Sequence, residues 1–145
     1  MALQMLIAVS MVVFTMMVHV AGLAGLLVLI PPRGRRLGAR RAILAEMALI
    51  LAVVNGLFLL HMLEVLAYAL LYRAGGALRT FRDAFAFSAA DYATVGADIS
   101  VPNGWRLVAA MEGANGVILL GFSTAFFVSV IAHIRDLLDE WRHRK

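Results

Sequence analysis

The sequence contains no cysteine, and only 15% of its 145 residues are charged. Without cysteine, the chain has neither disulfide bonds nor thiolate ligands for a metal ion. With so few charged side chains and 63% hydrophobic residues, a soluble domain of this length would lack the polar surface that it needs. The composition therefore predicts a protein embedded in a lipid bilayer, and the mean hydropathy of +0.89 agrees with this prediction.

Three long apolar stretches dominate the chain, and each exceeds the roughly 20 residues that cross a bilayer as a helix. They are Met1–Ile30, Ala42–Tyr72 and Leu107–Ile134. Proline is scarce, but Pro31-Pro32 is expected to end the first helix, because proline lacks the amide proton that a helix interior needs. We expect an all-α membrane protein with three transmembrane helices.

Arginines gather at the ends of these stretches and predict the orientation of the helices. A basic loop occupies residues 33–41, and a short basic tail occupies residues 135–145. Short loops rich in arginine and lysine stay on the cytoplasmic side of a membrane. The N-terminus is therefore expected outside, the C-terminus in the cytoplasm, and the segment 73–106 outside. The net charge of +4 is explained as a topology signal, and no nucleic-acid partner is expected.

The segment before the third stretch is not typical of a simple loop. Phe81, Ala84, Phe85 and Ser88 recur at helical spacing, which predicts a helix too short to span the membrane. Non-helical backbone at membrane depth is tolerated only when it is buried in protein or lines a water-filled path. We expect a re-entrant half-helix followed by an extended strand, with the helix C-terminus favouring a cation. An amphipathic helix lying on the membrane surface is the alternative.

The residues around this half-helix carry a family resemblance. Phe87-Ser88 and Tyr92-Ala93-Thr94-Val95-Gly96 stand between two spanning helices, and this order resembles the two-helix pore domain of the potassium-channel superfamily, in particular small bacterial ion-channel proteins. The resemblance covers about residues 61–130. After the filter it includes Trp105-Arg106-Leu107, Glu112-Gly113, Asn115-Gly116 and Gly121-Phe122-Ser123-Thr124-Ala125.

This resemblance implies a homotetramer with a central pore in a bacterial inner membrane. Residues 42–134 would form the pore domain, comprising outer helix, pore helix, filter and inner helix. Residues 1–32 would be an additional N-terminal transmembrane helix that packs outside it, where Ala21 and Gly25 form a small-xxx-small pair for close helix contact.

The expected ion filter departs from the family pattern. Potassium filters read Thr-Val-Gly-Tyr-Gly and replace the water shell of the ion with carbonyl oxygens. This chain lacks the tyrosine and the second glycine, so the outer ion sites should be wider or absent. We expect a cation channel that selects weakly between K⁺ and Na⁺; a potassium-selective channel and a non-conducting membrane protein with the same fold are the alternatives. The filter residues would be Thr94, Val95, Gly96, Ala97 and Asp98.

Asp98 is the expected metal-binding residue of this filter. Four Asp98 carboxylates would form a ring at the outer mouth, which attracts cations and suits a Ca²⁺ ion. Local pairing of Asp98 with Arg82 or Arg106 is the alternative.

Polar residues within the third helix are further candidates, since such residues are costly in a membrane. Glu112, Asn115 and Ser123 are expected to border a water-filled cavity below the filter. For Glu112, a position behind the half-helix that braces it is an equal alternative. Gly116 is placed near the hinge of the inner helix by the resemblance, and tight helix packing is its structural alternative.

Histidines are few and scattered. His61 and Glu64 are expected to pair with each other or with the half-helix, but His19, His61, His133 and His143 lack the spacing of a metal site. No nucleophile–base pair is visible, so we expect neither an enzyme nor an organic cofactor.

Overall fold

A computed structural model describes the backbone of residues 1–30 and 39–142, and the side chains of residues 1–30 and 44–136. These residues form helices and turns and contain no strand, so the all-helical prediction is confirmed. The elements in chain order are α1 (Ala2–Leu27), α2 (Ala39–Ala74), α3 (Phe81–Tyr92), the 3₁₀ turn η1 (Asn103–Trp105) and α4 (Arg106–Arg142).

Three of these helices are long and apolar enough to cross a membrane, as predicted. The spans are Ala2–Leu27, Leu44–Ala74 and Asn103–Asp136, each with a hydropathy of 2.2. Large apolar side chains remain exposed along them; Met17 is 68% exposed and Leu59 is 62% exposed. Apolar surface of this extent is unfavourable in water and favourable in lipid, which indicates a membrane protein.

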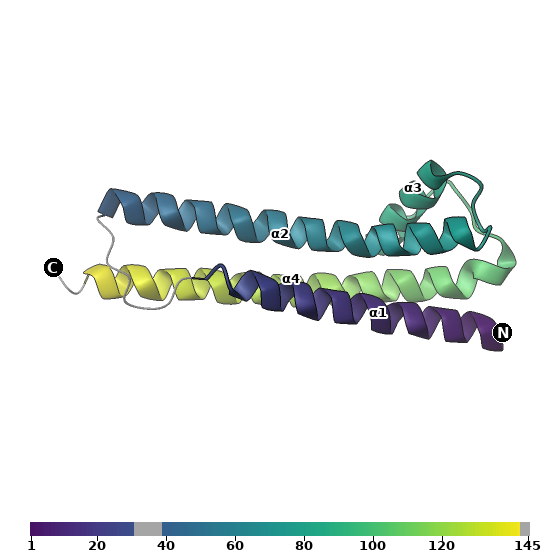
Figure 1. The fold of residues 1–145 in the computed structure, drawn as a ribbon, viewed down its shortest axis with the longest axis horizontal. Coiled ribbons are helices and arrows are strands. Elements are labelled where there is room, and N and C mark those ends of the chain that lie inside the picture. The colour runs from purple at the N-terminus through teal and green to yellow at the C-terminus, as the bar shows by residue number, and fades with distance from the viewer. Residues whose placement is uncertain (31–38, 143–145) are drawn as a thin grey trace.

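The three long helices lie side by side, and α3 lies alongside α2, near the end of the bundle where α1 begins (Figure 1). α3 packs against α2 and α4, while α1 packs against α4 and α2. With 12 residues, α3 is about 18 Å long. It is therefore much shorter than the hydrocarbon core of a bilayer, which is about 30 Å thick.

Local sequence signals fix the connection from α2 to α3. α2 ends at Ala74, and Gly76 follows with a φ of +73°, a left-handed conformation that glycine adopts readily. The side chain of Thr80 then caps α3, because its hydroxyl oxygen accepts a hydrogen bond from the backbone N–H of Asp83 at 3.0 Å. α3 therefore begins at a defined position soon after α2 ends.

Two predicted boundaries differ from the structure. The basic loop was expected at residues 33–41, but α2 begins at Ala39, so Arg40 and Arg41 lie in its first turn. Residues 33–38 and Pro31-Pro32 lie outside the described residues. The predicted tail at 135–145 continues α4 as a helix as far as Arg142, and residues 143–145 also lie outside the described part.

Within its own chain, the first helix packs through a different glycine from the one that its sequence suggests. A Cβ atom added to Gly25 would meet nothing within 4 Å, so no helix in the described part of the same chain packs on Gly25, and close contact of another helix through Ala21 and Gly25 stays a prediction. Instead, Gly22 lies directly against the side chain of Leu60 in α2. α1 also contributes to the interior of the chain, because three of its residues are buried: Ala8, Thr15 and His19.

Candidate functional site

The filter segment, Thr94–Asp98, lies on the surface immediately after α3. All five residues are exposed, and Val95 is 81% exposed. The backbone N–H of Thr94 donates to the carbonyl of Asp91 at 2.9 Å, and that of Val95 donates to the carbonyl of Ala90 at 2.9 Å. The N–H of Gly96 also reaches the Ala90 carbonyl, at 3.3 Å. These N–H groups therefore point back at the end of α3.

The backbone of this segment is a turn, so the expected extended strand is wrong for Thr94–Gly96. Thr94 has a φ of +57° and Gly96 a φ of +81°. A positive φ is uncommon for threonine and easy for glycine. In the part of the chain that the structure describes, the carbonyl oxygens of Thr94, Val95 and Gly96 accept no hydrogen bond. Three oxygen atoms that suit a hard cation are thus left without a protein donor.

Asp98 is exposed at the end of the filter segment. Among residues 44–136, the structure contains no ion pair between Asp98 and either Arg82 or Arg106, the local partners considered for it. Local pairing therefore has no support in a single chain.

Two glycines of α4 bring this helix against the end of α3. A Cβ atom on Gly113 would lie 3.2 Å from the carbonyl oxygen of Asp91, and one on Gly116 would overlap the carbonyl of Tyr92. Asp91 is half-buried beside this contact, and burial raises the pKa of its carboxyl group. Close packing against α3 therefore explains why residue 116 is a glycine. This explanation is the alternative to the predicted hinge.

The predicted cavity-lining residues of α4 face the interior of their own chain. Glu112, Asn115 and Ser123 are 0%, 1% and 6% exposed. The hydroxyl groups of Tyr72 and Ser88 donate hydrogen bonds to Glu112 at 2.6 and 2.5 Å. The prediction of a cavity lining is therefore wrong for these three residues, because side chains buried within one chain cannot line a space between chains.

The contacts of Glu112 match the bracing alternative, since Ser88 belongs to α3 and Tyr72 to α2. Asn115 similarly joins α4 to α1, because its side-chain amide donates to the hydroxyl oxygen of Thr15 at 2.8 Å. Residues 112, 115, 116 and 123 do share one face of α4, as the sequence indicates. That face is covered by the other helices of the same chain.

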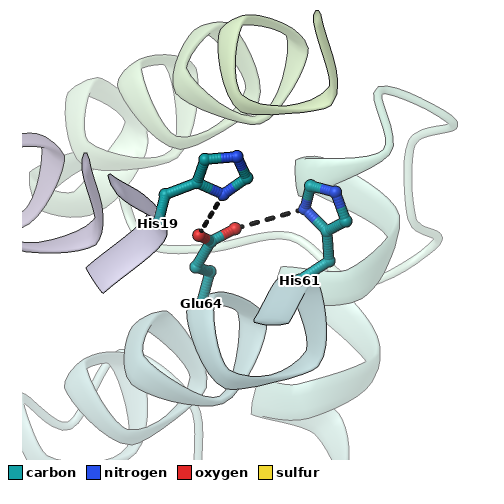
Figure 2. A group of neighbouring side chains, drawn as sticks. All are labelled: His19, His61 and Glu64. Atoms are coloured by element: carbon teal, nitrogen blue, oxygen red, sulfur yellow. Dashed lines mark hydrogen bonds and ion pairs between the residues drawn. The ribbon is translucent and has the colours of Figure 1, made fainter. Parts of the chain in front are cut away.

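A second polar site lies deeper in the bundle. We define the buried polar cluster as His19, His61, Glu64, Tyr92 and Ser123. Figure 2 shows the Glu64 carboxylate between the two imidazole rings: Oε1 lies 2.7 Å from Nδ1 of His19, and Oε2 lies 3.2 Å from Nδ1 of His61. The Tyr92 hydroxyl donates to Oε2 at 2.5 Å and lies 2.7 Å from Nδ1 of His61.

Ser123 closes the cluster on its other side. Its hydroxyl oxygen lies 2.9 Å from Nε2 of His61 and 3.4 Å from Nε2 of His19. Every long helix and α3 thus supply at least one member. The side chains of His19 and Glu64 are fully buried, and that of His61 is 13% exposed. Burial and the adjacent Glu64 carboxylate raise the pKa of Tyr92, so its phenol keeps its proton and donates.

Sequence reasoning paired two of the five members of this cluster. The contact of His61 with Glu64 and with α3 was predicted from their spacing on one helix, and it is confirmed. His19, His61, His133 and His143 lack metal-ligand spacing along the sequence, as stated above, but the fold brings ligand atoms of His19, His61 and Glu64 within 4.8 Å of one another. The available signal was the cost of each ionisable residue inside a membrane helix.

No protein-family model, curated protein or solved structure matches this chain. The resemblance to a channel pore domain therefore depends on the motif residues themselves and on their placement between two membrane-spanning helices.

Proposed function

We propose that the chain is one subunit of a tetrameric cation channel of the potassium-channel superfamily. One observation supports this proposal above the others: the exposed filter segment follows a 12-residue helix that lies between two helices of membrane-spanning length. Its N–H groups bond to α3 and leave the carbonyl oxygens of Thr94, Val95 and Gly96 available. Carbonyl oxygens that replace water around an ion are the basis of potassium-channel filters.

A single chain offers one filter segment, and one segment cannot enclose an ion. Head-to-tail contacts between copies form a closed ring when their rotation closes. In a four-fold ring, the exposed face of Thr94–Asp98 would turn toward the axis, and lipid would cover the apolar surfaces of the long helices. We therefore propose a homotetramer with the lipid bilayer as its surroundings.

One face of α4 would line the ion path below the filter. This face begins at Gly113 and continues with exposed residues toward the C-terminus of the helix. A Cβ atom on Gly113 would lie 4.0 Å from the Thr94 side chain, so this face of α4 borders the filter segment. The next exposed residues at helical spacing are Val117, Leu120 and Thr124. We propose these residues, in place of the three buried ones, as the lining of the inner path.

Weak selectivity follows from the residues that the segment lacks. In a potassium filter, a bulky tyrosine ring would stand behind the outer ion sites. This chain has the small, exposed side chain of Ala97 in place of that ring. Each tenfold preference between two ions needs about 1.4 kcal/mol of differential binding. A filter with fewer rigid sites has fewer places to generate that difference, so K⁺ and Na⁺ should permeate comparably.

The proposed orientation puts the filter segment outside and the basic residues near the start of α2 in the cytoplasm of a bacterial cell. Because the chain has no cysteine, a single introduced one can be labelled without background. Ala74→Cys lies on an exposed residue at the end of α2 and should react with an impermeant maleimide added to intact cells. Labelling of this residue only after lysis would reverse the orientation.

Single-channel recording in reconstituted bilayers tests the function. With K⁺ on one side and Na⁺ on the other, the proposal predicts discrete cation currents with a reversal potential close to zero. A reversal potential that follows the K⁺ gradient alone would establish the potassium-selective alternative. Absence of current from preparations that native mass spectrometry shows to be tetramers would establish the non-conducting alternative.

A further inference from the structure

We propose that His19, His61 and Glu64 bind a divalent transition-metal ion such as Zn²⁺, with the Tyr92 hydroxyl as a fourth donor. Two imidazoles and a carboxylate are a ligand set that zinc uses in proteins, and four donors without an open position are typical of a structural site. This inference does not depend on ion conduction, because it concerns the interior of one chain.

The donor atoms are close enough for coordination after small side-chain movements. In a tetrahedral zinc site the ligands lie about 2.0–2.1 Å from the metal, and so roughly 3.4 Å from one another. The Nδ1 atoms of His19 and His61 lie 2.7 and 3.2 Å from the two Glu64 oxygens, and the three ligand atoms lie within 4.8 Å of one another. Changes of about 1 Å in these separations, which side-chain rotations can supply, would make room for the ion.

Ser123 provides the outer contact that metal-binding histidines require. Both rings turn Nδ1 toward Glu64 and Nε2 toward the Ser123 hydroxyl. When a metal binds Nδ1 of a neutral imidazole, the ring proton resides on Nε2 and needs an acceptor. The two lone pairs of the Ser123 oxygen can accept both protons.

Metal binding would fix the tautomer of both rings. In the metal-free cluster, each ring nitrogen donates or accepts according to which nitrogen carries the proton. With Nδ1 bound to the metal, each neutral ring keeps its single proton on Nε2, and no proton is lost from either ring.

The Glu64 carboxylate, which lies between the two imidazoles, offsets one of the two positive charges of the ion. The bound ion would connect α1, α2 and α3 directly and α4 through Ser123, so its role would be to hold the four helices together.

Metal analysis of purified protein without a polyhistidine tag tests the proposal. The protein is stripped with a chelator, reloaded with Zn²⁺, dialysed and analysed for metal per chain by mass spectrometry. We expect about one ion per wild-type chain, as for a closed site with a full ligand set. Co²⁺ in place of Zn²⁺ should give the visible absorption of a tetrahedral site with nitrogen and oxygen ligands.

Matched variants locate the ion. His19→Gln and Glu64→Gln should each abolish stoichiometric binding, and Ser123→Ala should weaken it by about 10–100-fold as an outer contact. His133→Gln, which lies on α4 outside the cluster, should bind like the wild type. Equal loss in His133→Gln would assign the metal to another place and overturn the proposal.

The wild-type measurement decides the question even if a variant fails to fold. Folded wild-type protein, shown to be helical by circular dichroism, that retains no Zn²⁺ and gives no Co²⁺ spectrum overturns the metal site.

Discussion

The filter segment and the buried polar cluster meet at the end of α3 but are built on opposite principles. Tyr92, the last residue of α3, is 3% exposed and is held by side chains from α2. Val95, three residues later, is 81% exposed. The cluster uses side chains inside one chain, whereas the filter segment presents backbone carbonyls at the surface. The short helix is thus fixed by buried side chains, while the segment that follows it stays exposed.

This difference predicts two groups of substitutions, which differ in their effect on the stability of the chain. Changes in the cluster should reduce the stability of the single chain, because they leave buried polar atoms without partners. Changes in the filter segment should leave the stability of the chain nearly unaltered, because those side chains are already exposed. They should instead change ion passage. The predictions below test this division in order of decreasing effect on stability.

The largest loss is expected for Glu64→Gln, measured in chelator-containing detergent by reversible unfolding. Glu64 lies beside His19 and His61 and accepts from Tyr92, so its charge has three hydrogen-bonding neighbours. Removing a buried charged partner of this kind costs about 3 kcal/mol or more.

The control is Glu46→Gln, the same substitution on the same helix. Glu46 is half-exposed and lies about five helical turns from Glu64. Its effect should stay within about 0.5 kcal/mol. Equal effects of the two substitutions would show that the cluster does not hold the bundle together.

An intermediate effect is expected at the contact between α4 and the end of α3. In Gly116→Ala the added methyl group overlaps the Tyr92 carbonyl, which is backbone and cannot rotate away. Overpacking of this kind costs about 1–3 kcal/mol. The same unfolding assay should show little loss for Gly121→Ala, where the methyl group meets nothing within 4 Å. Similar behaviour of both variants would contradict the close approach of α4 to α3.

The smallest effect on stability is expected for Asp98→Asn, within about 0.5 kcal/mol, since Asp98 is exposed. In recordings, however, this variant should relieve block by millimolar external Ca²⁺ while conduction persists, because the proposed carboxylate ring loses its charge. Unchanged Ca²⁺ block would remove Asp98 from the ion path. A large loss of stability would instead give it a structural role.

Much of the fold could be predicted from sequence because its signals are local. The three long helices follow from apolar length, and the short α3 follows from the spacing of Phe81, Ala84, Phe85 and Ser88. The turn after α2 follows from Gly76, whose left-handed backbone glycine adopts without strain.

The partners of the polar residues could not be predicted in the same way. Helical spacing places Glu112, Asn115 and Ser123 on one face of α4, but it does not indicate what covers that face. In a membrane helix, a polar stripe suits either a water-filled path or a bundle interior. The partner of His19 is still harder to predict. Its contact with Glu64 joins two helices, so the residue spacing within either helix does not indicate it.

The central claim is that four filter segments meet around one axis, and cross-linking of Ala97→Cys in membranes tests it most directly. Identical residues of different copies come close together only near a symmetry axis, so a short bifunctional maleimide should join neighbouring chains at this position. Met17→Cys, exposed on α1, is the matched control and should give no joined chains. Cross-linked pairs for Ala97→Cys alone would support the account. Failure of Ala97→Cys to cross-link, although it reacts with a monofunctional maleimide, would contradict a shared filter.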